Sequence, residues 1–192
     1  RTAGKIFERY LFNDKRGTDS RDPGNTVGFL AVSSGASGSG TASNSPLPNL
    51  GLNRVFVLTT ANTCSASESV INGLRGVDLD VIVLGGRTCG KPYGFTARDN
   101  CGLSYFPVEF QGVNEKGFGD FADGFAPTCA VADDLDEPLG SVSEGLLAGA
   151  LAYRGGASCA AISVAKSDPS RGAPAEAALV RSPARGSKFL TP

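Results

Sequence analysis

The chain has 192 residues, of which 41% are hydrophobic, and this is enough for one domain with its own core. Its net charge of −1 gives no overall field that would attract nucleic acid or a membrane surface. It contains no histidine, which excludes Ser-His-Asp and Cys-His catalysis and every zinc site with a histidine ligand. A nucleophilic enzyme of this composition must use another base, and lysine is the usual substitute.

The N-terminal part of the chain predicts short elements joined by turns. Residues 5–13 carry apolar and aromatic side chains that suit a short helix or a strand, and their periodicity does not decide between the two. Residues 27–32 predict a strand. Residues 33–49 are rich in Gly, Ser, Asn and Pro, which predicts a mobile surface loop. The long uncharged run at 26–53 is rich in the same residue types and is therefore no membrane span.

The central pattern of the chain is a strand, a turn, a helix and a second strand. Residues 54–60 and 80–84 are β-branched and apolar enough for buried strands. The helix between them is expected to open at Ser65, and Gly76 stands where a helix can end in a left-handed cap. A unit of this length normally gives parallel strands with a right-handed crossover.

Ser65 and Lys91 form the candidate catalytic pair, because parallel strands deliver both following turns to the same sheet edge. At the start of a helix, the N–H of Ala66 and the helix dipole could stabilise an oxyanion. A lysine that acts as a base must be neutral, which partial burial would favour. Glu68 could orient this lysine. The same residues have a plainer interpretation, since Ser65 and Glu68 fit a capping box and lysines in turns are usually solvated.

The C-terminal half predicts a strand at 103–110, with a bend at Pro107, and a helix at 141–154. This helix starts with Ser-Val-Ser-Glu, a second capping-box pattern. The carboxylates of the turn-rich region before it lack the spacing of a calcium-binding loop, so we expect no metal and no cofactor. Residues 156–192 are rich in Ala, Ser and Pro and predict a loosely packed tail.

The five cysteines favour an oxidising compartment, with one thiol left over if two pairs form. The alternative is that some of them are buried thiols. Cys89 and Cys101 bracket the short excursion after the second strand and are the predicted disulfide. Cys64, beside Ser65, competes as a partner for either of them.

The order of these motifs resembles the tail-specific, or C-terminal-processing, serine peptidases. The resemblance rests on a strand followed by Ser-Ala-Ser-Glu at 65–68, a Gly-Lys turn at 90–91, and a Leu/Ala helix at the end. Between them lies an N-x-x-G-x-G-D-x-x-D-G-x-x-P stretch at 114–127. Together these motifs extend over residues 53–151, about half of the chain.

The resemblance implies a serine endopeptidase that cleaves polypeptides through an acyl-enzyme. Ser65 would be the nucleophile, Lys91 the general base, and Glu68 would support the pair. The implied fold is α/β and crotonase-like, built from repeated strand–strand–helix units. Residues 1–155 would hold the C-terminal part of this catalytic domain. The extra cysteines resemble those of a bacterial subgroup located in the envelope, which implies a periplasmic or extracellular protein.

The chain departs from the family in three ways. No glycine-rich strand that would supply an oxyanion amide is recognisable in residues 1–53, no peptide-binding PDZ segment is present, and the spacing from Ser65 to Lys91 is slightly long. We therefore expect that activity needs residues upstream of this chain. Two other interpretations stay open. One is a non-catalytic module of the same fold that binds apolar ligands or peptides. The other is a structural domain in which Ser65 caps its helix and Lys91 lies in solvent.

Overall fold

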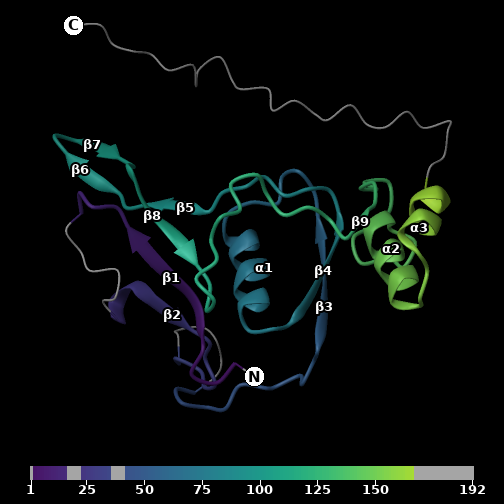
Figure 1. Cartoon of the computed structure of the whole chain (residues 1–192), viewed down its shortest axis with the longest axis horizontal. Coiled ribbons are helices and arrows are strands. Elements are labelled where there is room, and N and C mark those ends of the chain that lie inside the picture. The colour runs from purple at the N-terminus through teal and green to yellow at the C-terminus, as the bar shows by residue number, and fades with distance from the viewer. Residues whose placement is uncertain (1, 17–22, 36–41, 167–192) are drawn as a thin grey trace, which may run out of the picture.

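Figure 1 shows the computed structural model of the chain, which describes residues 2–16, 23–35 and 42–166. Within these residues the chain forms an α/β fold of three β-sheets and three α-helices. In chain order the elements are β1 (Ile6–Phe12), a 3-10 turn (Pro23–Asn25), β2 (Thr26–Gly28), β3 (Arg54–Thr59), α1 (Ala66–Gly76), β4 (Asp80–Gly85), β5 (Tyr93–Phe95), β6 (Arg98–Asn100), β7 (Leu103–Tyr105), β8 (Val108–Val113), β9 (Cys129–Ala130), α2 (Gly145–Arg154) and α3 (Cys159–Lys166).

The predicted strand–helix–strand unit is confirmed. Strands β3 and β4 are parallel and in continuous register from the pair Arg54 and Asp80 to the pair Thr59 and Gly85. The short strand β9 extends this sheet on the other side of β4, so the order is β3-β4-β9. Because helix α1 connects β3 to β4, the carboxyl ends of both strands lie at one edge of the sheet.

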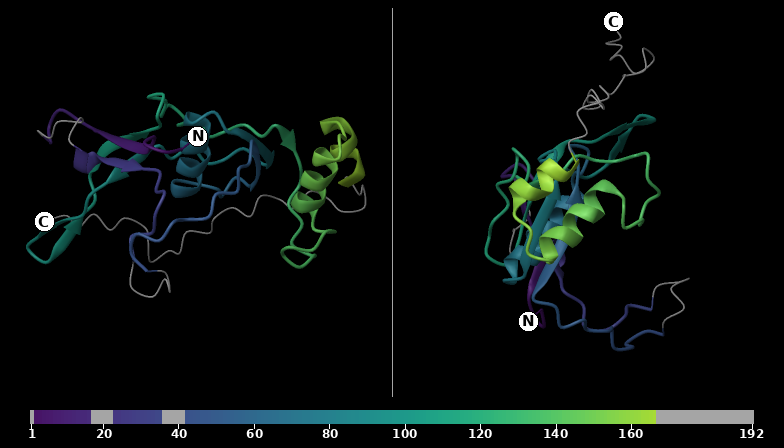
Figure 2. Two further views of the ribbon diagram at one scale, coloured as in Figure 1. Left: turned by 90° about the horizontal axis from the view of Figure 1, so that it is seen from below. Right: turned by 90° about the vertical axis from the view of Figure 1, so that its right-hand side faces the viewer.

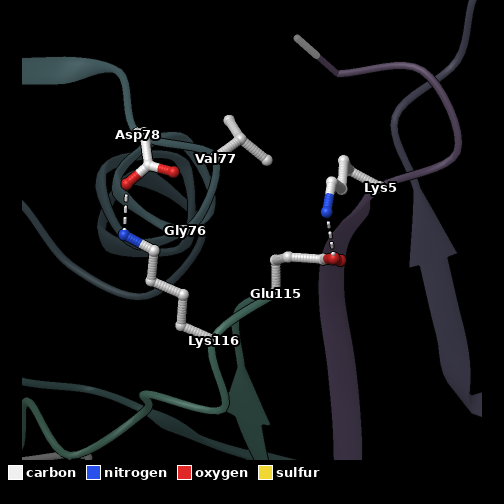
Figure 3. A pocket seen from close by; sticks show the side chains of 6 residues that line it. All are labelled: Lys5, Gly76, Val77, Asp78, Glu115 and Lys116. Atoms are coloured by element: carbon white, nitrogen blue, oxygen red, sulfur yellow. Dashed lines mark hydrogen bonds and ion pairs between the residues drawn. The ribbon is translucent and has the colours of Figure 1, made fainter.

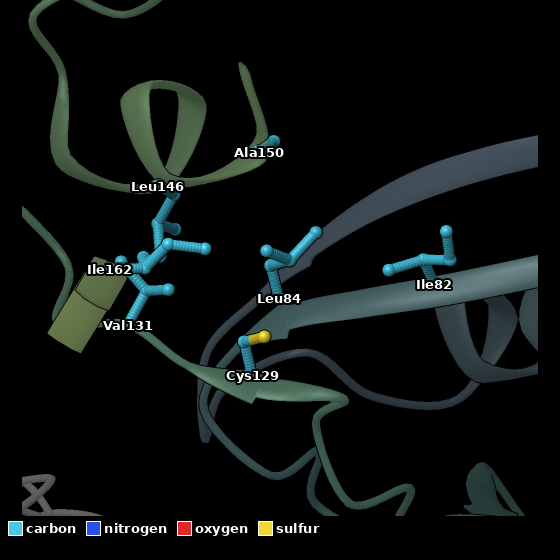
Figure 4. Packing of buried hydrophobic residues seen from close by; sticks show 7 residues of the cluster. All are labelled: Ile82, Leu84, Cys129, Val131, Leu146, Ala150 and Ile162. Carbon is cyan, nitrogen blue, oxygen red and sulfur yellow. The ribbon is translucent and has the colours of Figure 1, made fainter. Parts of the chain in front are cut away.

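Strand β4 is apolar at successive positions because both of its faces are covered. Val81 and Val83 pack with Ile71 of α1, and Ile71 is 0% exposed. Ile82 and Leu84 point to the opposite face, where helices α2 and α3 lie. Figure 4 shows this second cluster, whose members are Ile82, Leu84, Cys129, Val131, Leu146, Ala150 and Ile162.

Helix α1 lies between the parallel sheet and a four-stranded antiparallel sheet of order β2-β1-β8-β5 (Figure 1). The approach of strand β1 requires a glycine on the helix, since a Cβ at Gly73 would lie 2.6 Å from Cδ2 of Phe7. A separate hairpin, β6–β7, projects from the end of the molecule opposite to α2 and α3 (Figure 2).

Two predictions about the C-terminal part are corrected. The helix expected at 141–154 begins at Gly145, because the carboxylate of Glu144 accepts the N–H groups of Leu146 and Leu147 at 2.8 and 2.9 Å. The second capping box is therefore wrong, and Glu144 alone caps α2. The tail does not become loosely packed at residue 156, because α3 follows and Ile162 is only 3% exposed in the core. Residues 167–192 lie outside the described part of the chain.

In the N-terminal half, the open choice at residues 5–13 is decided in favour of a strand, β1. The strand expected at 27–32 is shorter and is limited to β2. Pro107 divides the strand expected at 103–110 into β7 and β8, in agreement with the expected bend. Gly76 is the last residue of α1 but not its left-handed cap, because positive φ occurs at Asp78 instead.

The described part of the segment 33–49 is partly paired. Val32 and Pro46 form an isolated antiparallel bridge, and the N–H of Ser33 donates to the carbonyl of Ser45 at 2.8 Å. The ends of the segment are therefore held together by the backbone. Its expected mobility stays a prediction.

Candidate active site

The candidate site lies where strands β3 and β4 end. The N–H of Gly86, just after β4, donates to the carbonyl of Thr59 at 2.8 Å. Further along, the N–H of Cys89 donates to the carbonyl of Thr63 at 3.0 Å. The turn that leads into α1 and the loop that carries Lys91 are therefore in direct backbone contact. The expectation that both segments return to one sheet edge is confirmed.

The carboxylate of Glu68 binds both of these segments. Its Oε2 accepts the N–H of Ser65 at 3.0 Å and the N–H of Lys91 at 2.8 Å. Its Oε1 accepts the N–H of Gly90 at 2.8 Å and the hydroxyl of Thr88 at 2.5 Å. Glu68 is 0% exposed, so its four donors replace the water that the carboxylate loses on burial. The backbone N–H groups of Ser65 and Lys91 thus donate to the same oxygen atom of Glu68.

Thr88 links this carboxylate to a more distant part of the chain. Its hydroxyl donates to Glu68 and accepts the N–H of Phe125 at 2.7 Å, while its own N–H donates to the carbonyl of Phe125 at 3.1 Å. Thr88 is 4% exposed. Thr88 was not predicted as a site residue, because a threonine two positions before a Gly-Lys pair carries no recognisable signal.

The stretch at 114–127 contacts the Lys91 loop directly. A Cβ at Gly124 would collide with the carbonyl oxygen of Thr88, and a Cβ at Gly90 would collide with that of Ala122. Both glycines have positive φ, +72° and +80°. This stretch therefore packs backbone to backbone on the Lys91 loop and fixes its path.

Ser65 adopts a backbone conformation that is rare for a residue with a side chain, with φ 54° and ψ −113°. Such conformations persist only where the surrounding structure imposes them, and they are common at functional sites. Ser65 is half-buried and stands at the N-cap of α1. In the capping box, the N–H of Ser65 donates to the carboxylate of Glu68. The Ser65 hydroxyl faces the N–H of Glu68 but makes no cap hydrogen bond with it.

The side chain of Lys91 lies in a different place from that expected. Lys91 is exposed, and its Nζ lies 5.6 Å from the centre of the Phe95 ring, a cation–π contact. The expected partial burial is therefore absent, and no hydrogen bond joins Nζ to the Ser65 hydroxyl. The structure brings the two backbones together but leaves the two functional groups apart.

Ala66 is the first residue of α1 and is exposed. Its N–H therefore has no acceptor within the helix. This is the state expected of an oxyanion donor next to a nucleophile at Ser65. Every helix start has such N–H groups, and the position of Ala66 is compatible with this role.

The predicted disulfide between Cys89 and Cys101 is wrong. Cys89 is bonded to Cys64, with a Cα–Cα distance of 5.3 Å, and Cys101 is an exposed free thiol. Cys64 precedes Ser65, so the argument that brings Ser65 and Lys91 to one edge also brings Cys64 to Cys89. A second disulfide joins Cys129 of β9 to Cys159 of α3. The resulting two pairs and one leftover thiol agree with the expected count.

A pocket of about 420 Å³ lies at the opposite end of α1, where that helix ends. It is open to solvent and is lined by Lys5, Gly76, Val77, Asp78, Glu115 and Lys116 (Figure 3). Its charged side chains form two ion pairs, Lys5 with Glu115 and Lys116 with Asp78. The charged side chains of this pocket are therefore paired with one another, whereas Ser65, Glu68 and Lys91 lie at the other end of α1. We place the candidate site at Ser65.

Comparison with known proteins identifies a shared fold. No protein-family model and no curated protein sequence matches the chain. A solved structure from Bacteroides fragilis NCTC 9343, described as a "Putative S41 protease", superimposes with a TM-score of 0.59 and is 24% identical. The match covers 80% of this chain but 37% of that chain, so the sequence spans little more than a third of its structural neighbour. At this identity the likeness establishes the α/β fold. In the described residues no helix is long and apolar enough to cross a membrane.

Proposed function

We propose that this chain is part of a serine peptidase in which Ser65 is the nucleophile and Lys91 the general base. The observation that supports this assignment best is the shared acceptor Glu68, which binds the N–H groups of both residues with one buried carboxylate oxygen. The likeness to a structure described as a "Putative S41 protease" supports the same class of activity. It also supports a crotonase-like arrangement, of which this chain forms a C-terminal part that extends beyond residue 155 to include α3.

In this mechanism the amine of Lys91, in its neutral form, takes the proton of the Ser65 hydroxyl as the oxygen attacks the scissile carbonyl. The N–H of Ala66 donates to the oxyanion of the tetrahedral intermediate. The proton then passes from Lys91 to the leaving amine, and an acyl-enzyme remains on Ser65. Water, deprotonated by Lys91, releases the acyl group. Glu68 holds the two backbones in place throughout.

The lysine side chain must move for this chemistry. Nζ leaves the face of Phe95 by rotation about the side-chain single bonds, a motion that takes picoseconds to nanoseconds for an exposed residue. A polypeptide substrate that covers Lys91 would also remove water from the amine and favour its neutral form. We propose that a second oxyanion donor and a peptide-docking surface come from parts of the protein outside this chain.

The two disulfides support a location outside the reducing cytoplasm, and we propose the periplasm or the extracellular side of a bacterial envelope. We also propose that the peptidase belongs to the tail-specific family, on the basis of the order of its motifs. The proposed mechanism uses no cofactor.

Labelling with a fluorophosphonate, which reacts with activated serines, tests the proposal. The intact protein should be labelled at Ser65, and Ser65→Ala should lose both labelling and peptide hydrolysis while its unfolding free energy falls by no more than about 1 kcal/mol, the usual contribution of a cap. Ser67→Ala is the matched control, since Ser67 lies in the same turn of helix and is exposed. Full hydrolytic activity in Ser65→Ala would show that Ser65 is not the nucleophile and would favour the structural interpretation, in which it caps its helix.

A further inference from the structure

The Cys64–Cys89 disulfide lies beside both candidate catalytic residues. Cys64 precedes Ser65 directly, and Cys89 lies two residues before Lys91. We propose that this cross-link positions the site, and that its reduction by a dithiol lowers the activity reversibly. The proposal rests on the proposed function, because it concerns the regulation of the same Ser65–Lys91 site.

The conformation of Ser65 gives the first reason. Its φ of 54° is unfavourable for a side chain and must be imposed by its neighbours. Around this residue the turn is held by the hydrogen bond to Glu68, by the disulfide at Cys64, and by the carbonyl of Thr63, which accepts the N–H of Cys89. Two of these three restraints end at Cys89. Reduction therefore removes the disulfide. The hydrogen bond from Cys89 to Thr63 remains, but Cys89 is then less restrained.

The Lys91 loop gives the second reason. After Cys89 the loop is attached to α1 through the N–H groups of Gly90 and Lys91, which both donate to Glu68. Hydrogen bonds of this kind open transiently when a segment unfolds locally. With the cross-link in place an opened loop stays next to its acceptor and closes again at once. Without it the open state becomes more populated, and Lys91 spends less time beside Ser65.

The two disulfides differ in their accessibility to a reductant. Cys89 is exposed and Cys64 is half-buried, whereas in the other disulfide Cys159 is half-buried and Cys129 is 2% exposed within the core cluster between β4, α2 and α3. Thiol–disulfide exchange needs access of a thiolate to a sulfur atom, so accessible disulfides react first. A dithiol should therefore reduce Cys64–Cys89 while Cys129–Cys159 remains intact.

The exchange is balanced in atoms and electrons. One thiolate of the dithiol attacks the sulfur of Cys89, the S–S bond breaks, and Cys64 leaves and takes up a proton. The second thiol of the reagent then attacks the mixed disulfide and releases Cys89, which also takes up a proton. The dithiol supplies two electrons and two protons and ends as a cyclic disulfide. Oxidation by a disulfide reagent of the same class reverses both steps.

The test uses the intact protein at increasing concentrations of dithiothreitol. Alkylation and mass spectrometry report which disulfide has opened, fluorophosphonate reports the labelling rate of Ser65, and hydrogen exchange reports the protection of the amides of Gly90 and Lys91. We expect Cys64–Cys89 to open first. The labelling rate should then fall by roughly 10²-fold, the usual effect of a small misplacement of reacting groups, and both amides should exchange faster. Reoxidation should restore both quantities.

Two double variants serve as controls. Cys64→Ser with Cys89→Ser should be labelled slowly without dithiothreitol and should not respond to it. Cys129→Ser with Cys159→Ser should have a lower Tm but the normal labelling rate below that Tm, and it should keep the response. If the first double variant does not fold, the titration of the unmodified protein still decides, because it follows each disulfide separately.

The proposal is overturned if protein reduced only at Cys64–Cys89 keeps its labelling rate and its protection at Gly90 and Lys91. It is also overturned if Cys129–Cys159 opens first. Absence of Ser65 labelling in the fully oxidised protein would contradict the proposed function instead. In that case the exchange of the two amides still decides whether the cross-link positions the loop.

Discussion

Replacing Glu68 by glutamine tests the part of the site that the structure describes best. The carboxylate has two oxygens, and each accepts two hydrogen bonds from the Ser65 turn and the Lys91 loop. Glutamine has nearly the same shape but replaces one oxygen with an NH₂ group, which donates. Glu68→Gln therefore fills the same space, and its effect reports on hydrogen bonding and not on packing.

The cost depends on which oxygen is replaced. An NH₂ group in the place of Oε2 would face two backbone donors, those of Ser65 and Lys91. In the place of Oε1 it would face the N–H of Gly90 and the hydroxyl of Thr88, which can turn and accept. The second orientation deprives both the buried N–H of Gly90 and the hydroxyl proton of Thr88 of their acceptor and changes charged hydrogen bonds to neutral ones. Together these effects should lower the free energy of unfolding by about 3 kcal/mol.

Thermal unfolding and fluorophosphonate labelling measure the two consequences of Glu68→Gln. A loss of about 3 kcal/mol should lower Tm by about 6–12 °C in a chain of this size. Below that Tm, labelling of Ser65 should slow by about 10²-fold, because the Lys91 loop is no longer held.

The matched control is Glu144→Gln. Glu144 is also buried and accepts two N–H groups, but it caps α2 away from the site. Its loss should cost about 1 kcal/mol and leave labelling unchanged. Normal labelling in folded Glu68→Gln would refute the argument that this carboxylate positions the site.

Three further predictions concern other parts of the chain. Lys91→Arg should fold normally but lose labelling and hydrolysis, because a guanidinium stays protonated at working pH; an active arginine variant would exclude Lys91 as the base. The N–H of Ile6 lowers the pKa of Glu115, so the stabilisation from this carboxylate is present above the ordinary glutamate pKa of about 4.3 and is lost as pH falls through the lowered value. Glu115→Gln should remove this part of the decline in Tm between neutral and acid pH, and an unchanged pH profile would contradict the assignment. Gly90→Ala should destabilise the fold by more than Gly102→Ala in urea unfolding, since both positions have positive φ, which costs an alanine about 1–2 kcal/mol, but only at Gly90 would a Cβ strike backbone. Equal losses of unfolding free energy in the two variants would mean that the Lys91 loop shifts to accommodate the added Cβ.

The sequence predicted the segment around the site well because its signals are local. Two apolar β-branched runs on either side of an amphipathic helix leave few topologies, and the observed parallel pair β3–β4 is the common one. The same pattern places the turn at Ser65 and the loop at Lys91 at one sheet edge. The capping-box pattern also correctly paired Glu68 with the backbone of Ser65.

Local patterns failed where a long-range contact made the decision. Two copies of Ser-x-Ser-Glu occur in the chain, and only the first behaves as a capping box. At the second, Glu144 itself is the N-cap of α2, and the close approach of Asp134 requires a glycine at position 145, where a Cβ would lie 2.9 Å from the Cβ of Asp134. The disulfide prediction failed for a related reason, since Cys101 is closer to Cys89 in sequence while Cys64 is closer in space.

By itself, the sequence determined the α/β class, the parallel unit at its centre, and which turns meet at its edge, because these follow from hydrophobic periodicity and chain handedness. Only the tertiary structure decided that Glu68 accepts hydrogen bonds from four groups, that Cys64 pairs with Cys89, and that the amine of Lys91 lies over Phe95. Each of these depends on the relative positions of segments that are separated along the chain. The type of a side chain determines which interactions it can form. Its partner is determined only when the packed backbone brings the two groups into contact.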